Sequence, residues 1–237
     1  MRNERRFLLL AALFVGLTGC ITIEENYTFK KNGSGTMTYV IDMSEMGSMI
    51  ESMGEGEKKE GEAGDLGDMD MTNHADALKS IAGISKVKMD KGKKWIQKLS
   101  FTFKDVAALN RALNQLMPDS SGTSHEFFKW DGGTLVHTGN RHAYEISSTM
   151  ANEAVAEDAG DEGDEGDEDG TGGFDMSSML SSMKYKYSFK FQEAVTSAEG
   201  GAMTREEAGA KEVKLSTDWG VLAKDPQALD VRIALKR

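Results

Sequence analysis

Hydrophobic and polar residues alternate along much of this chain, which is the pattern of half-buried β-strands. In the segments 21–29 and 37–43 the apolar positions lie on one face of each run. An Asn-Gly-Ser-Gly sequence at 32–35 separates the two runs. Because asparagine and glycine accept the positive φ of a tight turn, this arrangement predicts a β-hairpin.

The same alternation recurs to the end of the chain. Its clearest case is 183–191, where Met, Tyr and Phe residues alternate with lysines and a serine. Half-polar strands of this kind are typical of an antiparallel sheet with one solvent-exposed face. The further strands predicted in this way are 87–89, 95–103, 127–136, 143–146, 213–219 and 231–235.

Helical patterns are shorter and fewer. Asp105 has the character of an N-cap for a helix over 106–117, whose apolar residues recur at spacings of three and four. A second helix is predicted at 75–81 and a single turn at 225–228. The pattern therefore predicts an α+β fold, in which a curved antiparallel sheet of about seven strands packs on one main helix.

Two acidic, glycine-rich tracts interrupt this pattern, at about 54–73 and about 152–174. Such segments bury too little apolar surface to offset the entropy of ordering their backbone. We expect them to be flexible insertions within a single domain, because predicted strands flank both of them.

The N-terminus has the form of an export signal. Three arginines precede an uncharged run from Phe7 to Gly19, which is too short to span a bilayer comfortably. The run ends in Leu-Thr-Gly-Cys at 17–20, which resembles the lipobox of bacterial lipoproteins. That resemblance implies removal of residues 1–19, acylation of Cys20 with chains such as palmitate, and a lipid-anchored domain at 20–237. The alternative is an ordinary signal peptide with an incidental cysteine.

Composition narrows the function further. The net charge is −11, which argues against nucleic acid or an acidic bilayer surface as the main partner. Cys20 is the only cysteine, so an internal disulfide is excluded. The sequence contains no nucleophile elbow, phosphate-binding loop or zinc-protease motif. We therefore expect a non-enzymatic protein without a cofactor.

Methionine is the most unusual feature of the composition, with 15 residues. Two groups of them lie at helical spacing beside the acidic tracts. Methionine is an adaptable packing residue suited to an apolar ligand groove, and its thioether is also a ligand for Cu(I). Both interpretations stay open at this point. The candidate groove residues are Met46, Met49, Met53, Met176, Met179 and Met183.

The lipobox, the Tyr27-Thr28-Phe29 strand and the turn at 32–35 together resemble the start of uncharacterised envelope lipoproteins of Bacteroidota-type bacteria. They are more distantly similar to LppM-like lipoproteins. That resemblance implies an antiparallel sheet around a helix and a lipid-binding role, but it assigns no functional residue. In the best-studied lipoproteins, an aspartate directly after the lipidated cysteine signals inner-membrane retention. Position 21 is an isoleucine, which favours the outer membrane.

The expected function is therefore binding of an amphiphile or envelope component in an apolar groove. The alternatives are Cu(I) binding by the Met-rich segments and a structural or protein-interaction surface module.

The lipid anchor is directly testable. We expect the protein to be recovered from the membrane fraction, without residues 1–19 and with a mass increased by the acyl chains on Cys20, because two or more buried chains hold a protein stably on a bilayer. Mass spectrometry of the fractionated cell checks this. Recovery of the intact precursor from the cytosol with a free thiol would contradict it.

Overall fold

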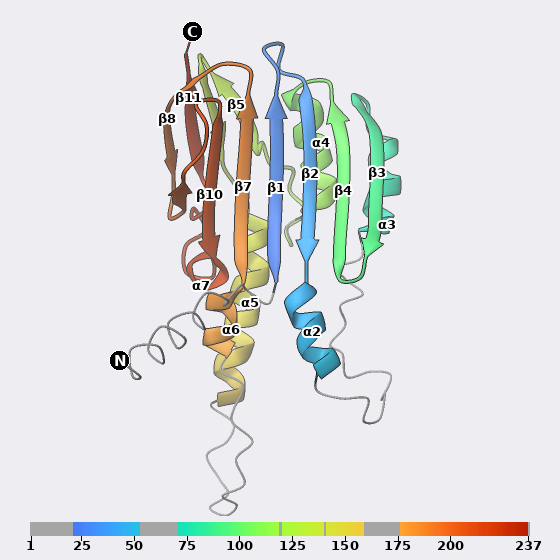
Figure 1. The fold of residues 1–237 in the computed structure, drawn as a ribbon, viewed down its shortest axis with the longest axis vertical. Coiled ribbons are helices and arrows are strands. Elements are labelled where there is room, and N and C mark those ends of the chain that lie inside the picture. Colours follow the sequence, from blue (N-terminus) through green and yellow to red (C-terminus); the bar gives the residue numbers. More distant parts are fainter. Residues whose placement is uncertain (1–20, 53–70, 119, 140, 159–175, 237) are drawn as a thin grey trace, which may run out of the picture.

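Eleven strands form two sheets in the computed structural model, which describes residues 21–52, 71–118, 120–139, 141–158 and 176–236. The two sheets lie face to face, and helices cover the rest of the larger sheet's inner face and its lower end (Figure 1). We call the end where β1 begins the lower end and the opposite end the upper end, as in Figure 1.

The larger sheet has seven strands in the order β3-β4-β2-β1-β7-β10-β9. The predicted hairpin is confirmed as β1 and β2, with Phe29 opposite Gly35. The outward face carries polar side chains, such as the ion pair of Lys190 with Glu212 at 3.5 Å. The strand bounds are β1 Thr22–Phe29, β2 Gly35–Asp42, β3 Ile84–Lys93, β4 Ile96–Phe103, β7 Lys184–Phe191, β9 Thr204–Glu206 and β10 Glu212–Asp218.

The centre of this sheet differs from the prediction. β1 and β7 run parallel, with Ile23 opposite Tyr185, whereas all other neighbouring strands of the sheet are antiparallel. The prediction of a purely antiparallel sheet is therefore wrong, and the sheet is mixed. A parallel pair requires a long crossover connection, and the whole chain between Phe29 and Lys184 supplies it.

The smaller sheet has four antiparallel strands in the order β5-β6-β11-β8. It packs its apolar face on the larger sheet, so that the Phe128 ring lies edge-on to Tyr27 with 4.9 Å between centroids. Leu135 and Ile233 are buried in the same layer. The core therefore lies between the two sheets. The strand bounds are β5 Phe128–Asp131, β6 Thr134–His137, β8 Val195–Gly200 and β11 Val231–Leu235.

The described residues contain six helices, so the prediction of one main helix is also wrong. The main predicted helix is confirmed as α4, and the Asp105 carboxylate caps it by accepting a hydrogen bond from the Ala108 N–H at 2.8 Å. The predicted strand at 143–146 lies instead in α5. The helix bounds are α2 Ser44–Ser52, α3 Thr72–Lys79, α4 Val106–Leu116, α5 Arg141–Asp158, α6 Met176–Ser182 and α7 Trp219–Leu222.

Helix α4 joins the two sheets. The Asn110 side chain donates to the Phe128 carbonyl and accepts from the Phe128 N–H, both at 2.8 Å. Asn114 makes the same pair of bonds with the backbone of His125, at 2.8 and 2.7 Å. These amides occupy backbone groups at the start of edge strand β5 that would otherwise be open for pairing. They fix the C-terminal end of α4, which borders the candidate site.

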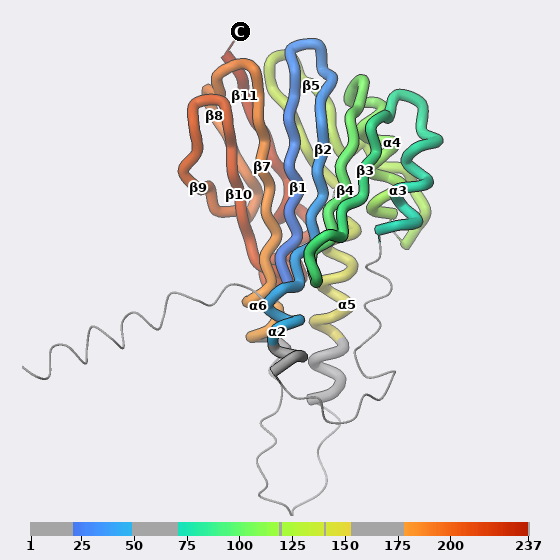
Figure 2. Tube along the Cα trace, turned by 45° about the vertical axis from the view of Figure 1, so that its right-hand side comes forward, coloured from blue at the N-terminus to red at the C-terminus, as the bar shows by residue number. Residues whose placement is uncertain are grey.

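Helices α2, α5 and α6 gather at the lower end of the strands (Figure 2). Most of both acidic tracts lies outside the described residues, as does Cys20. Of the predicted insertion ranges, Met71 is the N-cap residue of α3, residues 72–73 belong to α3, and residues 152–158 belong to α5. None of the described helices is both long and apolar enough to cross a bilayer.

Candidate functional site

A cavity of about 430 Å³ lies at the lower end, between the inner face of the larger sheet and the ends of several helices. Its floor is formed by Ile23 of β1 with Tyr39 and Ile41 of β2. The walls come from residues that begin or end helices, so the cavity exists only in the assembled fold. These wall residues are Met71, His74, Leu116, Pro118, His142, Ile146 and Trp219.

A buried carboxyl group lies beside this floor. Glu25 occupies the inward-facing row of β1, where it is fully buried. The strand register places Tyr39 of β2 opposite it on one side and Tyr187 of β7 on the other. The hydroxyl groups of Tyr27 and Tyr185 donate short hydrogen bonds to its two carboxylate oxygens. Four of the chain's five tyrosines thus surround one carboxyl group.

The tyrosines stay protonated in this environment. Burial, followed by the nearby charge of Glu25, raises the pKa of Tyr27 and of Tyr185 well above the usual value. The same two causes raise the pKa of Tyr39, which a hydrogen bond with Tyr185 partly offsets. A buried carboxyl group is tolerated only when donors satisfy it. The protonated hydroxyls therefore serve as obligatory donors to Glu25.

Two histidines stand on the cavity wall, and both are held in the same way. His74 Nδ1 lies 3.0 Å from the Gln115 carbonyl, and His142 Nδ1 lies 2.9 Å from the Pro118 carbonyl. Because a carbonyl only accepts, each Nδ1 carries a proton, and Nε2 is the ring nitrogen left for a further partner. Burial is the main cause that lowers the pKa of His142. The hydrogen bond to the Pro118 carbonyl and the charge of Glu145 oppose this shift, and the charge of His74 adds to it. The two imidazoles therefore share one electrostatic environment.

Two buried ring nitrogens have no hydrogen-bond partner within the described residues. One is Trp219 Nε1, which belongs to a cavity-lining side chain. The other is Nε2 of His137, which packs between the sheets with its ring 4.4 Å from Phe128. Burial lowers the pKa of His137 to about 4, so that this ring is neutral at neutral pH. Only the Trp219 donor is associated with the cavity.

The methionines predicted to line a groove are placed as follows. Met183 is fully buried in the core, and Met46 and Met179 are half-buried against it. Met49 and Met176 belong to α2 and α6, but their side chains lie outside the description, as does all of Met53. The described ones are not among the residues that line the cavity, whose methionine is Met71.

Helix α2 is seated at the lower end by a close contact. The ring of Trp95, in the turn between β3 and β4, lies against the backbone of Gly47, where an added Cβ would approach ring atoms to 2.4 Å. The Met43 N–H also donates to the Trp95 carbonyl at 2.8 Å. Glycine is therefore required at this point of the Met-rich helix.

Sequence reasoning missed Glu25 and the pairing of the two histidines. Glu25 could have been found, because it falls at an odd position between Ile23 and Tyr27 in a row of inward-facing residues. The approach of His142 to His74 had no signal in the sequence, since they are 68 positions apart and the segment 143–146, now in α5, was predicted as a strand. In the described ranges, no group of three or more His, Cys, Asp or Glu side chains could hold a metal ion.

Comparisons with known proteins find a distant likeness among solved structures. No protein-family model and no curated protein matches the sequence. Among solved structures, the chain is similar to the NMR structure of the folded domain of Mycobacterium tuberculosis LppM, with 10% identity, coverage of 92% of this chain and 91% of that chain, and a TM-score of 0.41. The expected LppM likeness agrees with this match, while the Bacteroidota-type relationship stays a prediction. At this similarity no residue or function is transferred.

The Glu25 cluster leads to a stability prediction. Replacing Tyr185 by Phe keeps the ring but removes a donor to a buried carboxyl group, so the free energy of unfolding should fall by about 2 kcal/mol. The control is Tyr144→Phe, at the remaining tyrosine of the chain, which is half-buried on α5. This substitution should change the free energy of unfolding by less than about 0.5 kcal/mol. Urea denaturation measures both. Equal effects of the two substitutions would contradict the role assigned to the cluster.

Proposed function

We propose that this chain is an acylated, non-enzymatic lipoprotein of the cell envelope, anchored in the outer membrane, that binds an amphiphile in the lower-end cavity. One observation carries the proposal. A mostly apolar cavity of about 430 Å³ with a few polar groups on its wall lies at the end of the sheet where the chain emerges from Cys20. Pockets for small ligands commonly have volumes of about 300–1,000 Å³ and this mixed lining.

The position of the cavity supports an amphiphile. Ile23, on the cavity floor, is three residues from Cys20, and β1 begins between them. An acylated Cys20 would therefore hold the lower end next to the bilayer. The Met-rich helices α2 and α6 stand at the same end, with Met46 and Met179 half-buried there. A hydrocarbon chain leaving the bilayer would have only a short path to the cavity.

The polar groups of the wall suit a headgroup with oxygen atoms. The buried Trp219 N–H lacks an acceptor in the described part of the chain, and such a donor calls for a partner. A carboxylate or ester oxygen would supply that acceptor. The Nε2 lone pairs of His74 and His142 would accept from a hydroxyl group on the same ligand.

The test uses dodecanoate, below its micellar concentration, and thermal unfolding of the protein. Dodecanoate should raise Tm, since a ligand at 100 times its Kd stabilises the folded state by about 2.7 kcal/mol. Ile146→Trp fills the cavity, so dodecanoate should not raise the Tm of this variant above its value without ligand. Thr149→Trp, on the exposed face of the same helix, should retain it.

Two outcomes would refute amphiphile binding at this site. One is a wild-type Tm that dodecanoate leaves unchanged. The other is an increase of the same size in Ile146→Trp and in the Thr149→Trp control.

Cu(I) binding is a second candidate, and one observation favours it. His74, His142 and Met71 line the same cavity. Both Nδ1 atoms are bound to backbone carbonyls, which is how proteins orient metal-ligating imidazoles. Imidazole and thioether are both ligands for Cu(I). This donor set differs from the Met-rich segments expected from the sequence, because it adds the two nitrogen ligands that those segments lack.

The copper alternative is checked by anaerobic Cu(I) titration against a competing chelator. Replacing His74 and His142 together by Leu should weaken binding by more than about tenfold, since even indirect support of a metal ligand is worth that much. The variant with Met46, Met49, Met176 and Met179 replaced by Leu serves as the control and should bind normally. Weaker binding in the methionine variant but not in the histidine variant would place the site in the Met-rich segments. Unchanged binding in both variants would eliminate both candidate sites.

A further inference from the structure

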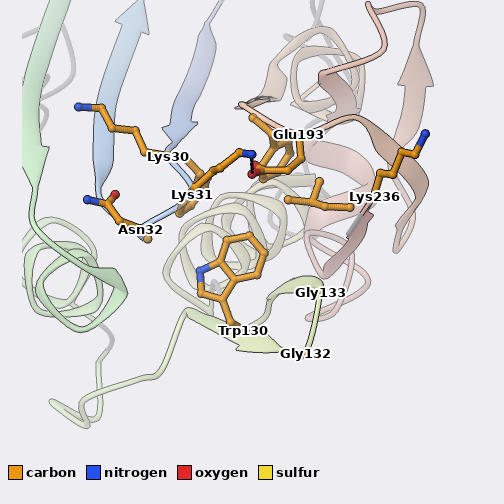
Figure 3. Close-up of a pocket in the computed structure, with 12 residues that line it drawn as sticks. Lys30, Lys31, Asn32, Trp130, Gly132, Gly133, Glu193 and Lys236 are labelled. Carbon is orange, nitrogen blue, oxygen red and sulfur yellow. Dashed lines mark ion pairs between the residues drawn. The ribbon is translucent and has the colours of Figure 1, made fainter.

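A second hollow, of about 420 Å³, lies at the upper end, away from the cavity described above. Four segments that are distant in the sequence meet there: the β1–β2 turn, the β5–β6 turn, the loop after β7, and the end of β11. In Figure 3 the indole of Trp130 lies below Lys31 and its ion pair with Glu193, while Lys30 and Lys236 extend to either side.

The floor of this hollow is aromatic and rigid. Phe29 and Phe191 are buried and stacked, with ring centroids 5.8 Å apart. Trp130 stands edge-on to Phe29 at 6.0 Å and is only half-buried. The contact with Phe29 fixes the indole in place. The part of the ring that remains exposed is therefore a preformed platform. The glycines at 132 and 133 carry no side chains that could cover it.

The rim is positively charged. Lys30, Lys31 and Lys236 line the hollow, and Glu193 is the opposing carboxylate. Glu193 pairs with Lys31 at 3.4 Å, whereas Lys30 and Lys236 have no carboxylate partner in the described part of the chain. This local excess of cations stands out on a chain with a net charge of −11. The hollow therefore attracts an anionic group.

An indole face beside lysines fits one class of ligand well. The face of an aromatic ring is electron-rich and receives the C–H groups of a sugar ring, and lysine ammonium groups pair with carboxylate or phosphate. A long polyanion such as nucleic acid would be repelled by the acidic remainder of the protein. A peptide that adds a strand would need a sheet edge, and the hollow lies at strand ends.

We propose that the upper-end hollow is a binding site for an anionic saccharide, which stacks on Trp130 and pairs its acidic groups with Lys30 and Lys236. The site is independent of the cavity and of the amphiphile proposal. β1 is eight residues long, so the hollow is roughly 26 Å from the lower end. If the lower end faces the bilayer, the saccharide is met on the side away from it.

The test measures binding to the acylated protein, purified from membranes in a polyoxyethylene detergent, by isothermal titration calorimetry. The probes are trigalacturonate, glucose 6-phosphate, neutral maltotriose and inorganic phosphate. At least one anionic sugar should bind more than about tenfold tighter than maltotriose and than phosphate. Which of the two binds identifies carboxylate or phosphate as the acidic group. Raising NaCl from about 0.05 to about 0.5 M should weaken that binding.

Variants locate the site. Trp130→Ala should weaken binding of the anionic sugar by more than about tenfold. The double variant Lys30→Gln/Lys236→Gln changes only exposed side chains, so it should fold normally, bind several-fold more weakly and show less dependence on salt. Lys79→Gln/Lys224→Gln removes two exposed lysines elsewhere and should bind as wild type.

Three results would overturn the proposal. The first is failure of both anionic sugars to bind. The second is that maltotriose or inorganic phosphate binds as tightly as the anionic sugar. Equal binding of maltotriose would indicate an unspecific sugar contact, and equal binding of phosphate would indicate an adventitious ion only. The third is unchanged binding in the Lys30→Gln/Lys236→Gln variant, which tests the site even if Trp130→Ala fails to fold.

Discussion

A single buried carboxyl group constrains the centre of this structure. Glu25 lies on the inner face of β1, where removal from water costs several kcal/mol unless donors satisfy it. One donor, Tyr27, comes from the same strand, and the other, Tyr185, comes from the parallel neighbour β7. A register shift of one residue would turn Glu25 to the outer face and move its partners away. The polar cluster therefore defines the register of the central strands as well as satisfying one charge.

The same cluster connects the core to the candidate site. Tyr39 stands opposite Glu25 in the sheet and also forms part of the cavity floor. One of the three floor residues is thus part of the hydrogen-bonded layer, and the other two are the apolar Ile23 and Ile41. The walls are different, because they consist of helix ends held by side-chain-to-backbone bonds such as those of His74 and His142. The floor and the walls of the cavity are therefore held by different kinds of contact.

Local signals in the sequence predicted the hairpin and the capped helix α4, because turn residues and an N-cap act over a few positions. Strands β8 and β9 were missed, since their residues are mostly exposed and show no alternation. The alternation at 143–146 predicts a strand, although Ala143, Ile146 and Met150 also fit the helical spacing along which α5 packs. Glu25 could have been read from its position in the inward row. The parallel pairing, the histidine pair and the lysines around Trp130 depend on the tertiary fold.

The parallel pairing of β1 with β7 has a consequence for how the protein is made. Tyr185, which donates a hydrogen bond to Glu25, lies 160 positions further along the chain. In a polypeptide exported from its N-terminus, the first hairpin would emerge early with one edge of β1 unpaired, and a two-stranded hairpin alone is marginally stable in water. An open edge recruits foreign strands. For a chain exported in this way, the open edge of β1 would be closed only when residues 184–191 arrive to complete the sheet.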